Sequence, residues 1–441
     1  MPPLSRLSVL LALAWAASPA LSQTLTLEDA LNKALRGDPT YLASEKTLEA
    51  GREARPQGVA GILPTISGSA TRYQRDYTGG TYAGTTLTPK TFAVSLSQPI
   101  FNLSLLRKAQ QGTQKVASAE ATFTKARQDT FIRVAAAYFD VLSAQDDLSS
   151  AQAEKKAIAE QLEQAKRSFE VGTATITDQQ EAQARFDLIL ANEIKAQNTL
   201  DVNRHALSLI VRETISGPLK SIQKSIPIPR PEPLDPLAWV DQARSSNPSV
   251  RKAEADLETA RLQVGAQFAG HLPSLNLVAN RTVARDASTT AAAADYEYNY
   301  VGVELSIPIF AGGLVTSQVR EAAALRSKAE LDLEAARLSA EQEARSAYLN
   351  VLAGLAQVSA YEAAEKSSQL ALDSNKLGYE VGVRINIDIL NSQQQLFTAK
   401  RNLSKARYDV LLASLKLKAA VGALSLADVQ AVSQLMAKAS D

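Results

Sequence analysis

The chain has 441 residues, with 47 Lys and Arg against 46 Asp and Glu. A net charge near zero excludes the basic electrostatic field of a nucleic-acid-binding protein. Cysteine is absent, which excludes disulfides, thiolate metal sites, thiol nucleophiles and the lipidated N-terminal cysteine of a lipoprotein. Aromatic residues make up 5% of the chain, while alanine, glutamine, serine and leucine are abundant. This composition is typical of long, closely packed helices.

The N-terminus, residues 1–22, predicts a signal peptide. A basic residue precedes an apolar run from Val9 to Ala17, and Ala20-Leu21-Ser22 offers small residues at the cleavage position. We therefore expect cleavage before Gln23 and export of the mature chain. An uncleaved membrane anchor is the weaker alternative, because the apolar run is too short to span a bilayer. No later stretch approaches about 20 consecutive apolar residues, so any part that crosses a membrane is expected to consist of strands.

The rest of the chain contains an internal duplication. With an offset of 209 residues, Leu63-Pro64 aligns with Leu272-Pro273, and Pro99-Ile100-Phe101 aligns with Pro308-Ile309-Phe310. So long a period excludes a solenoid of short units and predicts two similar halves. A connector with six prolines, too many for a helix, separates them. The predicted division is a first structural repeat at residues 23–213, the proline-rich connector at 214–236, a second structural repeat at 237–421 and a C-terminal tail at 422–441.

Within each repeat the hydrophobic period changes from that of a helix to that of a strand. Phe92, Val94 and Leu96 fall on one face of such a strand, while Ser95 and Ser97 fall on the other. One apolar and one polar face suits either a half-buried sheet or a membrane barrel with an aqueous lumen. Four strands cannot close a channel, so the membrane interpretation requires oligomerisation, and three protomers would supply 12 strands. The expected strands are at about residues 65–75 and 91–98, and at about 274–283 and 298–307.

Tyrosines lie near the ends of the loops that join the paired strands. Such positions suit an aromatic girdle at a membrane interface, with ordinary strand tyrosines as the alternative. The tyrosines are Tyr73, Tyr77, Tyr82, Tyr296, Tyr298 and Tyr300.

Long helical hairpins follow the strands, at about residues 103–211 and 312–421. The first helix contains no breaker, and nearly 70 residues at 1.5 Å each extend for about 100 Å. That exceeds the needs of one globular core. The helix carries a heptad seam in which Lys155 is the one charged residue. Glu365 takes the corresponding place in the second copy, so the two charges either pair or reach solvent.

Each long helix ends at a matching turn. Gly172 and Gly382 stand where a helix closes with a left-handed residue, and Asp178 and Asp388 are expected to cap the returning helices. Glu181, three residues after Asp178, gives that cap the pattern of a capping box. The plainer alternative is that these residues only shape a turn.

These features together resemble the TolC-type outer-membrane channel proteins, which serve type I secretion and multidrug efflux. The resemblance covers nearly the whole mature chain. It rests on the duplicated order of helix, two strands and helical hairpin, on the Pro-Ile-Phe segments after the second strand of each pair, and on the two Val-Gly turns. It implies a mainly helical α+β fold and a homotrimer, in which 12 transmembrane strands form one outer-membrane barrel and 12 helices continue it as a periplasmic tunnel.

The resemblance also implies a function and partners. The trimer would lie in the bacterial outer membrane with a large periplasmic portion. It would be the exit duct for an inner-membrane ABC or proton-driven transporter and a periplasmic adaptor (membrane fusion) protein. Its cargo would be proteins, as in type I secretion, or small molecules, as in multidrug efflux. No cofactor is implied.

The helix turns gain a role from the same resemblance, as a periplasmic aperture held shut by contacts between the two hairpins. Tyr379 and Arg384 should contact the neighbouring turn around Thr177 and Asp178. Asp388 should project a carboxylate into the pore, where three like charges near one axis favour a bound cation.

Two further expectations concern selectivity and docking. This chain has Asn391 where the family pattern has a second acid, which weakens the expected cation selectivity. The adaptor is expected to dock at Val171, Gly172, Val381 and Gly382.

Two other classes are weaker. An enzyme is disfavoured, because His205 and His271 are isolated and the sequence has no glycine-rich phosphate loop, nucleophile elbow or metal-ligand cluster. The acidic pair Asp146-Asp147 is expected to be solvated on the polar side of a coiled coil. A periplasmic coiled-coil adaptor or scaffold is the stronger rival, since it too contains long hairpins. It would not need four alternating strands with tyrosine-rich tips.

Overall fold

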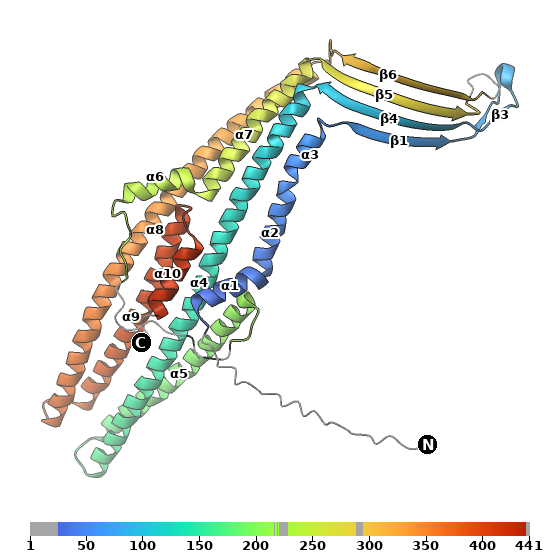
Figure 1. The fold of residues 1–441 in the computed structure, drawn as a ribbon. Coiled ribbons are helices and arrows are strands. Elements are labelled where there is room, and N and C mark those ends of the chain that lie inside the picture. The colour runs from blue at the N-terminus through green and yellow to red at the C-terminus, as the bar shows by residue number, and fades with distance from the viewer. Residues whose placement is uncertain (1–24, 216, 218, 220–227, 288–293, 438–441) are drawn as a thin grey trace, which may run out of the picture.

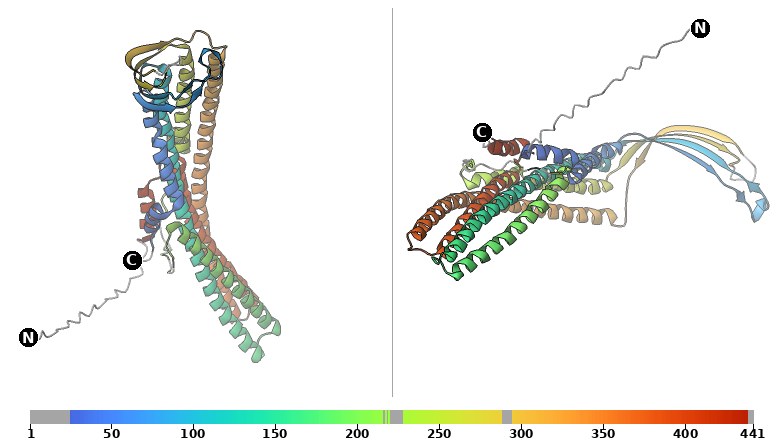
Figure 2. Two further views of the ribbon diagram at one scale, coloured as in Figure 1. Left: turned by 90° about the vertical axis from the view of Figure 1, so that its right-hand side faces the viewer. Right: turned by 90° about the horizontal axis from the view of Figure 1, so that it is seen from below.

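The computed structural model describes residues 25–215, 217, 219, 228–287 and 294–437. The signal-peptide prediction for residues 1–22 falls outside them. The described chain is a long body of helices with a four-stranded sheet that projects from one end (Figure 1). Seen from below, the sheet arches away from the helices (Figure 2). The mainly helical fold class is confirmed.

The first repeat runs from short helices through two long strands to the first long hairpin. Its main elements are α1 (Leu27–Gly37), α2 (Pro39–Arg52), α3 (Ala54–Ala60), β1 (Thr65–Arg72), β4 (Lys90–Phe101), α4 (Leu103–Glu170) and α5 (Ile176–Val211). The loop between β1 and β4 adds the paired strands β2 (Arg75–Asp76) and β3 (Thr86–Leu87), with the 3-10 turn η1 (Gly80–Tyr82) between them.

The second repeat follows the same plan, and one more helix lies in the C-terminal tail. Its elements are α6 (Pro236–Ser246), α7 (Pro248–Phe268), η2 (Ala269–His271), β5 (Ser274–Arg285), β6 (Tyr296–Ser306), α8 (Leu314–Glu380) and α9 (Asn386–Ala420). The tail helix is α10 (Leu426–Ala437).

The short helices at the start of each repeat break at equivalent points. Asp38 Oδ1 accepts a hydrogen bond of 2.9 Å from the Thr40 N–H, and Asn247 Oδ1 accepts one of 2.8 Å from the Ser249 N–H. A proline follows each cap as the first residue of the next helix. Its fixed φ suits a helix start, and the cap satisfies a free N–H. The chain therefore turns at these two positions.

The sheet has the order β1-β4-β5-β6, with all neighbours antiparallel. Thr65 opposes Ser97 in the first repeat, and Ser274 opposes Ser306 in the second. The duplicated strand pairs therefore share one register after a shift of 209 residues. Strands β4 and β5 join the two pairs, which leaves β1 and β6 as the edges.

Strand β4 is longer than predicted. It continues beyond residue 98 to Phe101, and its register with β5 shifts between Pro99 and Phe101. Proline has no N–H for the ladder, so an irregularity at this point lets pairing continue.

The tyrosines of β6 stand on the polar face of the sheet. Opposed residues in a ladder point to the same side, and Tyr298 opposes Thr282 while Tyr300 opposes Asn280. Tyr296 stacks on Tyr298, and Tyr298 on Tyr300, with ring centroids 6.0 and 6.3 Å apart. The prediction of an aromatic girdle is wrong for this row. A girdle needs rings on the apolar face of the sheet. The two-residue strand period places these rings on the other face.

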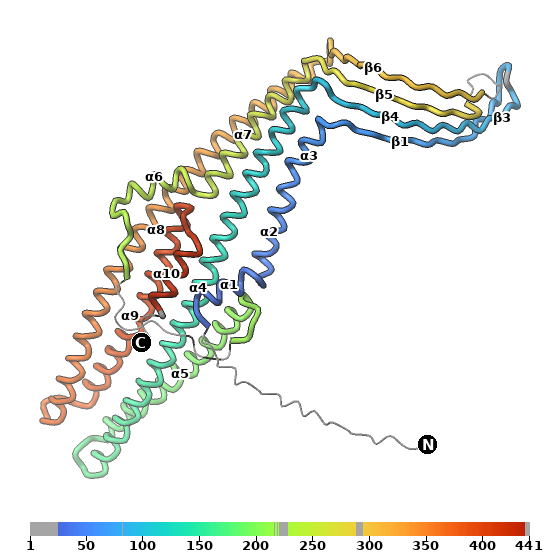
Figure 3. The backbone as a smooth tube through the Cα atoms, viewed as in Figure 1, coloured from blue at the N-terminus to red at the C-terminus, as the bar shows by residue number. Residues whose placement is uncertain are grey.

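Two long antiparallel hairpins form the helical body (Figure 3). Helix α4 has 68 residues and packs along α5, and α8 has 67 residues and packs along α9. In both repeats a buried tyrosine on the long helix donates to a carbonyl that precedes the first short helix. Tyr138 donates to Leu25 at 2.9 Å, and Tyr348 donates to Leu234. Helix α4 also contacts α9, which joins the hairpins.

Two predictions about charged residues on α4 are wrong. Lys155 does not pair with Glu365; it forms an ion pair with Glu193 of α5. The Asp146-Asp147 pair is not freely solvated, because Tyr408 of α9 donates a hydrogen bond of 2.8 Å to Asp146 Oδ2. Both differences arise because α4 packs against α5 and α9 along separate faces, whereas a heptad period identifies a single seam.

Candidate functional site: the two hairpin turns

The two hairpin turns lie at the end of the helical body remote from the sheet (Figures 1 and 3). Gly172 and Gly382 have φ angles of 79° and 78°, in the left-handed region. Their N–H groups bond to the carbonyls of Phe169 and Tyr379 at 3.0 and 3.1 Å. A Cβ at either glycine would meet nothing within 4 Å. The backbone angle, and not the space available, therefore requires glycine here.

The returning helices begin earlier than predicted. Thr175 is the N-cap of α5, and its hydroxyl accepts a 3.2 Å hydrogen bond from the Asp178 N–H. Asp178 Oδ2 accepts one of 2.9 Å from the Thr175 N–H. Asp178 is thus the third helical residue and closes a capping box with Thr175 rather than with Glu181. Thr177 lies exposed in the first turn of α5. The N-cap of α9 is Ile385, without a side-chain hydrogen bond, so Asp388 does not cap that helix.

Both turns expose valine side chains. Val171 is 74% exposed, Val381 66% and Val383 74%. The four residues predicted to dock an adaptor therefore stand at two accessible, partly apolar tips.

Arg384 folds back over its own turn. Its Nη1 lies 3.7 Å from Asp388 Oδ2, one helical turn further on. A Cβ added at Gly378 would meet Arg384 Cγ at 2.7 Å, so the arginine stem covers that glycine. Tyr379 packs into a small apolar cluster of α8 and α9. A contact of Tyr379 or Arg384 with the first hairpin turn stays a prediction for the assembled protein.

A hydrogen-bonded link that sequence analysis did not identify joins the hairpins behind the turns. Arg185 of α5 donates from Nη1 to Gln394 Oε1 at 2.7 Å and from Nη2 to Asn391 Oδ1 at 2.8 Å. Asn391, which stands in place of the family's second acid, is therefore an acceptor in this link. Its spacing from Gln394 puts both on one face of a helix. Nothing in the sequence places that face against α5.

Asn386 provides a second link that sequence analysis missed. The residue is 2% exposed. Its Oδ1 accepts a hydrogen bond from Gln161 of α4, and its Nδ2 donates one of 3.4 Å to the Asp178 carbonyl. Asn386 thus ties the start of α9 to both helices of the first hairpin. Removing one partner would leave a buried polar group unsatisfied, which is costly.

Polar contacts continue between α4 and α9 above the turns. Arg401 Nη1 lies 2.7 Å from Glu154 Oε2, and the Glu154 side chain is only 6% exposed. Burial raises the pKa of Asp140, Asp146 and Asp147 on α4, and the nearby Asp409 carboxylate raises that of Asp140 further. The contact between α4 and α9 therefore includes carboxyl groups that bind a proton more readily than freely solvated ones do.

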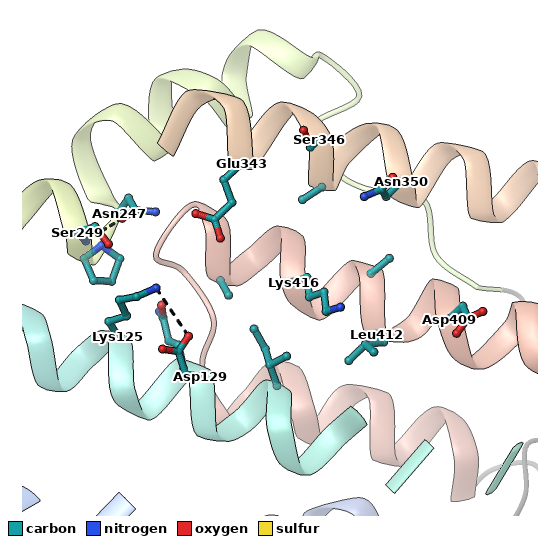
Figure 4. A pocket seen from close by; sticks show the side chains of 16 residues that line it. Lys125, Asp129, Asn247, Ser249, Glu343, Ser346, Asn350, Asp409, Leu412 and Lys416 are labelled. Atoms are coloured by element: carbon teal, nitrogen blue, oxygen red, sulfur yellow. Dashed lines mark hydrogen bonds and ion pairs between the residues drawn. The ribbon is translucent and has the colours of Figure 1, made fainter. Parts of the chain in front are cut away.

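A cavity of 510 Å³ lies where the start of α7 approaches the C-terminal half of α9, between α4 and α8 (Figure 4). Within it, Lys125 Nζ lies 3.8 Å from Asp129 Oδ1. Its walls carry both signs of charge, which selects no single class of ligand. Its charged side chains are Lys125, Asp129, Glu343, Asp409 and Lys416.

Two absences apply to the described residues. No group of three or more His, Asp or Glu side chains there is arranged to hold a metal ion, so a cation at Asp388 stays a prediction for the trimer. None of the helices in that part of the chain is both long and apolar enough to cross a membrane.

Comparison with known proteins identifies the family. The model for the outer membrane efflux protein family matches residues 30–211 and 239–423, one match in each repeat. The chain is 31% identical to outer membrane protein TolC of Escherichia coli (strain K12), over 98% of this chain and 89% of that protein. It is also 31% identical to alkaline protease secretion protein AprF of Pseudomonas aeruginosa, over 92% of this chain and 86% of that protein. The solved structure of VceC from Vibrio cholerae matches with a TM-score of 0.77 at 18% identity, covering 90% of this chain and 96% of that one.

The chain belongs to the outer membrane efflux protein family. It is an outer-membrane channel-tunnel protein for export, with its helical tunnel in the periplasm. The resemblance to TolC-type channels is confirmed, and nothing supports a periplasmic adaptor or scaffold. The family is one of transport channels rather than enzymes.

Proposed function

We propose that three copies of the chain assemble into one channel-tunnel. The four-stranded sheet carries this proposal, because its edge strands β1 and β6 pair with no further strand in the described chain. Open edges do not occur within the hydrocarbon region of a bilayer, so the sheet must be closed by other copies. Three sheets of four strands give a 12-stranded barrel with room for water. The hairpins below them would continue it as a 12-helix tunnel.

The internal duplication predicts how neighbouring sheets pair. Strand β6 corresponds to β4, and β1 corresponds to β5, so the β4–β5 register shifted by one repeat gives the register between protomers. Ser97 opposes Val278 within the chain. The shifted pair is Ser306 of one protomer and Ser69 of the next.

Engineered cysteines test this assembly cleanly, because the chain has no native cysteine. The double variant Ser69→Cys with Ser306→Cys should form covalent trimers under mild oxidation. The control, Thr65→Cys with Ser306→Cys, is out of register by four residues, about 13 Å, and should stay monomeric on a denaturing gel. Equal cross-linking in both variants, or none in either, would refute the proposed assembly.

The hairpin turns would serve as a gated aperture and a docking surface. Val171 and Val381, with their glycine neighbours, would offer an apolar surface to a periplasmic adaptor, which couples the tunnel to an inner-membrane ABC or proton-driven transporter. Three Asp388 carboxylates would meet near the threefold axis and attract cations. The links made by Arg185 and Asn386 would hold the two hairpins of each protomer together near the end of the tunnel remote from the sheet.

The cargo would be proteins or small molecules delivered by that transporter. AprF is named for secretion of an alkaline protease, which supports proteins as one cargo class for this chain. We assign no catalytic step and no cofactor. Export of a marker protease by a host strain that lacks its own channel, restored by this chain, would test the protein-export branch.

A further inference from the structure

The apolar face of the sheet ends in a row of positive charge. Phe92 and Val94 of β4 and Val301 of β6 lie on this face and are 54%, 37% and 76% exposed. At the end of the strands remote from the helices, Arg72 opposes Lys90, and Lys90 opposes Arg285 (Figure 1). Opposed residues share a face. Three adjacent strands therefore each place a cation on the apolar side at this edge of the apolar band. Strand β5 adds Arg281, which opposes Val94 within the band and has its Nη2 3.8 Å from Glu297 Oε2.

The nearby acids neutralise only one end of this row. Glu297 Oε1 lies 2.8 Å from Arg285 Nη2, and Asp295 Oδ2 lies 3.6 Å from Arg285 Nε. Within the described residues, neither Arg72 nor Lys90 forms an ion pair, and both side chains are exposed. Like charges directly opposite each other destabilise a strand pair. An anion that bridges Arg72 and Lys90 would remove that penalty.

A neighbouring protomer would not supply this anion. The register between protomers places Val303 of the next protomer opposite Arg72, because it repeats the pairing of Val94 with Arg281. The next residues of β6 on the same face are Val301 and Leu305. Arg72 would therefore stand beside an apolar surface in the trimer, where an unpaired charge is costly.

We propose that Arg72 and Lys90 form a binding site for the phosphate group of a phosphorylated glycolipid in the outer leaflet of the outer membrane. The lipid is the occupant we favour because the cations adjoin an apolar band that would contact its acyl chains. Two opposed strand residues have Cβ atoms about 5 Å apart, so one phosphate can accept charge-assisted hydrogen bonds from both. The inference rests on the proposed membrane position of the sheet.

Binding of lipid A to the full-length trimer in detergent tests the site. The probes are bisphosphorylated lipid A, the same lipid without phosphates, and inorganic phosphate. Each basic side chain near an anionic lipid surface contributes about a factor of five in affinity. The variant Arg72→Gln with Lys90→Gln should therefore bind the bisphosphorylated lipid roughly 25-fold more weakly. The charge-preserving variant Arg72→Lys with Lys90→Arg should bind nearly as the unmodified chain does.

A matched control changes the same charge elsewhere. Arg345→Gln with Lys366→Gln alters two exposed residues of α8 and should leave lipid affinity unchanged. Unaltered affinity in the Arg72 and Lys90 variant, or equal affinity for the lipid without phosphates, would overturn the proposal. Binding of inorganic phosphate as tight as that of the lipid would also overturn it, by showing a site for a free anion.

Single-channel conductance separates this inference from the proposed function. If the Arg72 and Lys90 variant conducts normally and keeps full lipid affinity, only the lipid site is refuted. If the unmodified chain forms no trimer and conducts no ions, the channel assembly itself is refuted, and the lipid site with it.

Discussion

Arg185 of α5 donates a hydrogen bond of 2.8 Å to Asn391 Oδ1 on α9, and the same guanidinium reaches Gln394 at 2.7 Å. One side chain thus clamps two residues of the opposite hairpin. The planar guanidinium fork suits two acceptors on one helix face. Because the link lies just behind the turns, it resists any motion that spreads the two hairpins of one protomer.

Replacing Arg185 should weaken the closed aperture. Arg185→Met keeps most of the apolar stem but removes both donors, a loss of about 1 to 2 kcal/mol. The closed state should then open about five to thirty times more often, measured as opening frequency in a planar bilayer. Lys195→Met, also on α5 and exposed, is the control and should behave normally. If the link made by Arg185 has no role in closure, both variants should open as often as the unmodified chain.

Asn391→Asp should have the opposite effect. The guanidinium of Arg185 is already charged, so a carboxylate at this position would turn the present hydrogen bond into an ion pair and add Coulomb attraction to it. We therefore expect fewer openings than in the unmodified chain. In the background Arg185→Met the same substitution should lose this effect, since its partner is gone. A decrease in opening that survives in that background would show that the carboxylate acts elsewhere in the pore.

Arg384→Ser should raise conductance if Arg384 contacts the first hairpin in the assembled aperture. Within the chain Arg384 pairs with Asp388 at 3.7 Å, and the arginine side chain is 57% exposed, so this pair contributes little by itself. Asp388→Asn breaks that pair and removes the carboxylate from the pore, but it leaves any contact of Arg384 with the first hairpin intact. The opening frequency should therefore change little, although cation selectivity should fall. Unchanged conductance in Arg384→Ser would count against a gating contact.

A charge at the hairpin tips should block docking. Val171→Asp with Val381→Asp places carboxylates on two apolar tip residues and should abolish cross-linking to the periplasmic adaptor. Assembly and conductance should persist, because both side chains are exposed and outside the helix contacts. Thr173→Asp adds a carboxylate at an exposed polar position of the same turn and should reduce cross-linking much less. Docking that tolerates the valine changes would place the adaptor elsewhere.

The sequence predicts the architecture well because the duplication repeats every element with its breaks. Pro39 and Pro248 mark equivalent helix starts, and alternation along β4 locates a strand. The face on which Tyr298 lies can be predicted from the sequence, since a two-residue period places Tyr298 and Val301 on different faces of the strand. The cap at Thr175 was missed because Asp178 is also a good capping residue, and only the backbone shows which one begins the helix.

The clamp at Arg185 could not be predicted. Its acceptors lie more than 200 residues away in the chain, and no local pattern brings α5 against α9. The ion pair of Arg401 with Glu154 was missed for the same reason. Helical periodicity defines which residues share a face, but the pairing of faces from different hairpins depends on tertiary packing.

The buried carboxyl of Asp146 predicts a pH dependence with a definite sign. Burial raises its pKa above the ordinary value of 3.8, although hydrogen bonds from Tyr408 and Ser404 act against the shift. An acid with a raised pKa in the folded state contributes stability that is fully present below its unfolded pKa and is lost as pH rises through the folded pKa. Asp146→Asn stays neutral at every pH and can still accept the Tyr408 hydrogen bond.

We therefore expect Asp146→Asn to raise the thermal unfolding midpoint at pH 7, with an advantage that shrinks as the pH falls toward 4. Asp373→Asn removes an exposed carboxylate on α8 and should show no such trend. Thermal melts of the detergent-solubilised trimer between pH 4 and pH 8 measure the difference directly. A variant that is less stable than the unmodified chain at pH 7 would mean that ionised Asp146 stabilises the contact between α4 and α9. In that case the favourable interactions of the Asp146 carboxylate with its neighbours, including Arg407, exceed the free-energy cost of burying its charge.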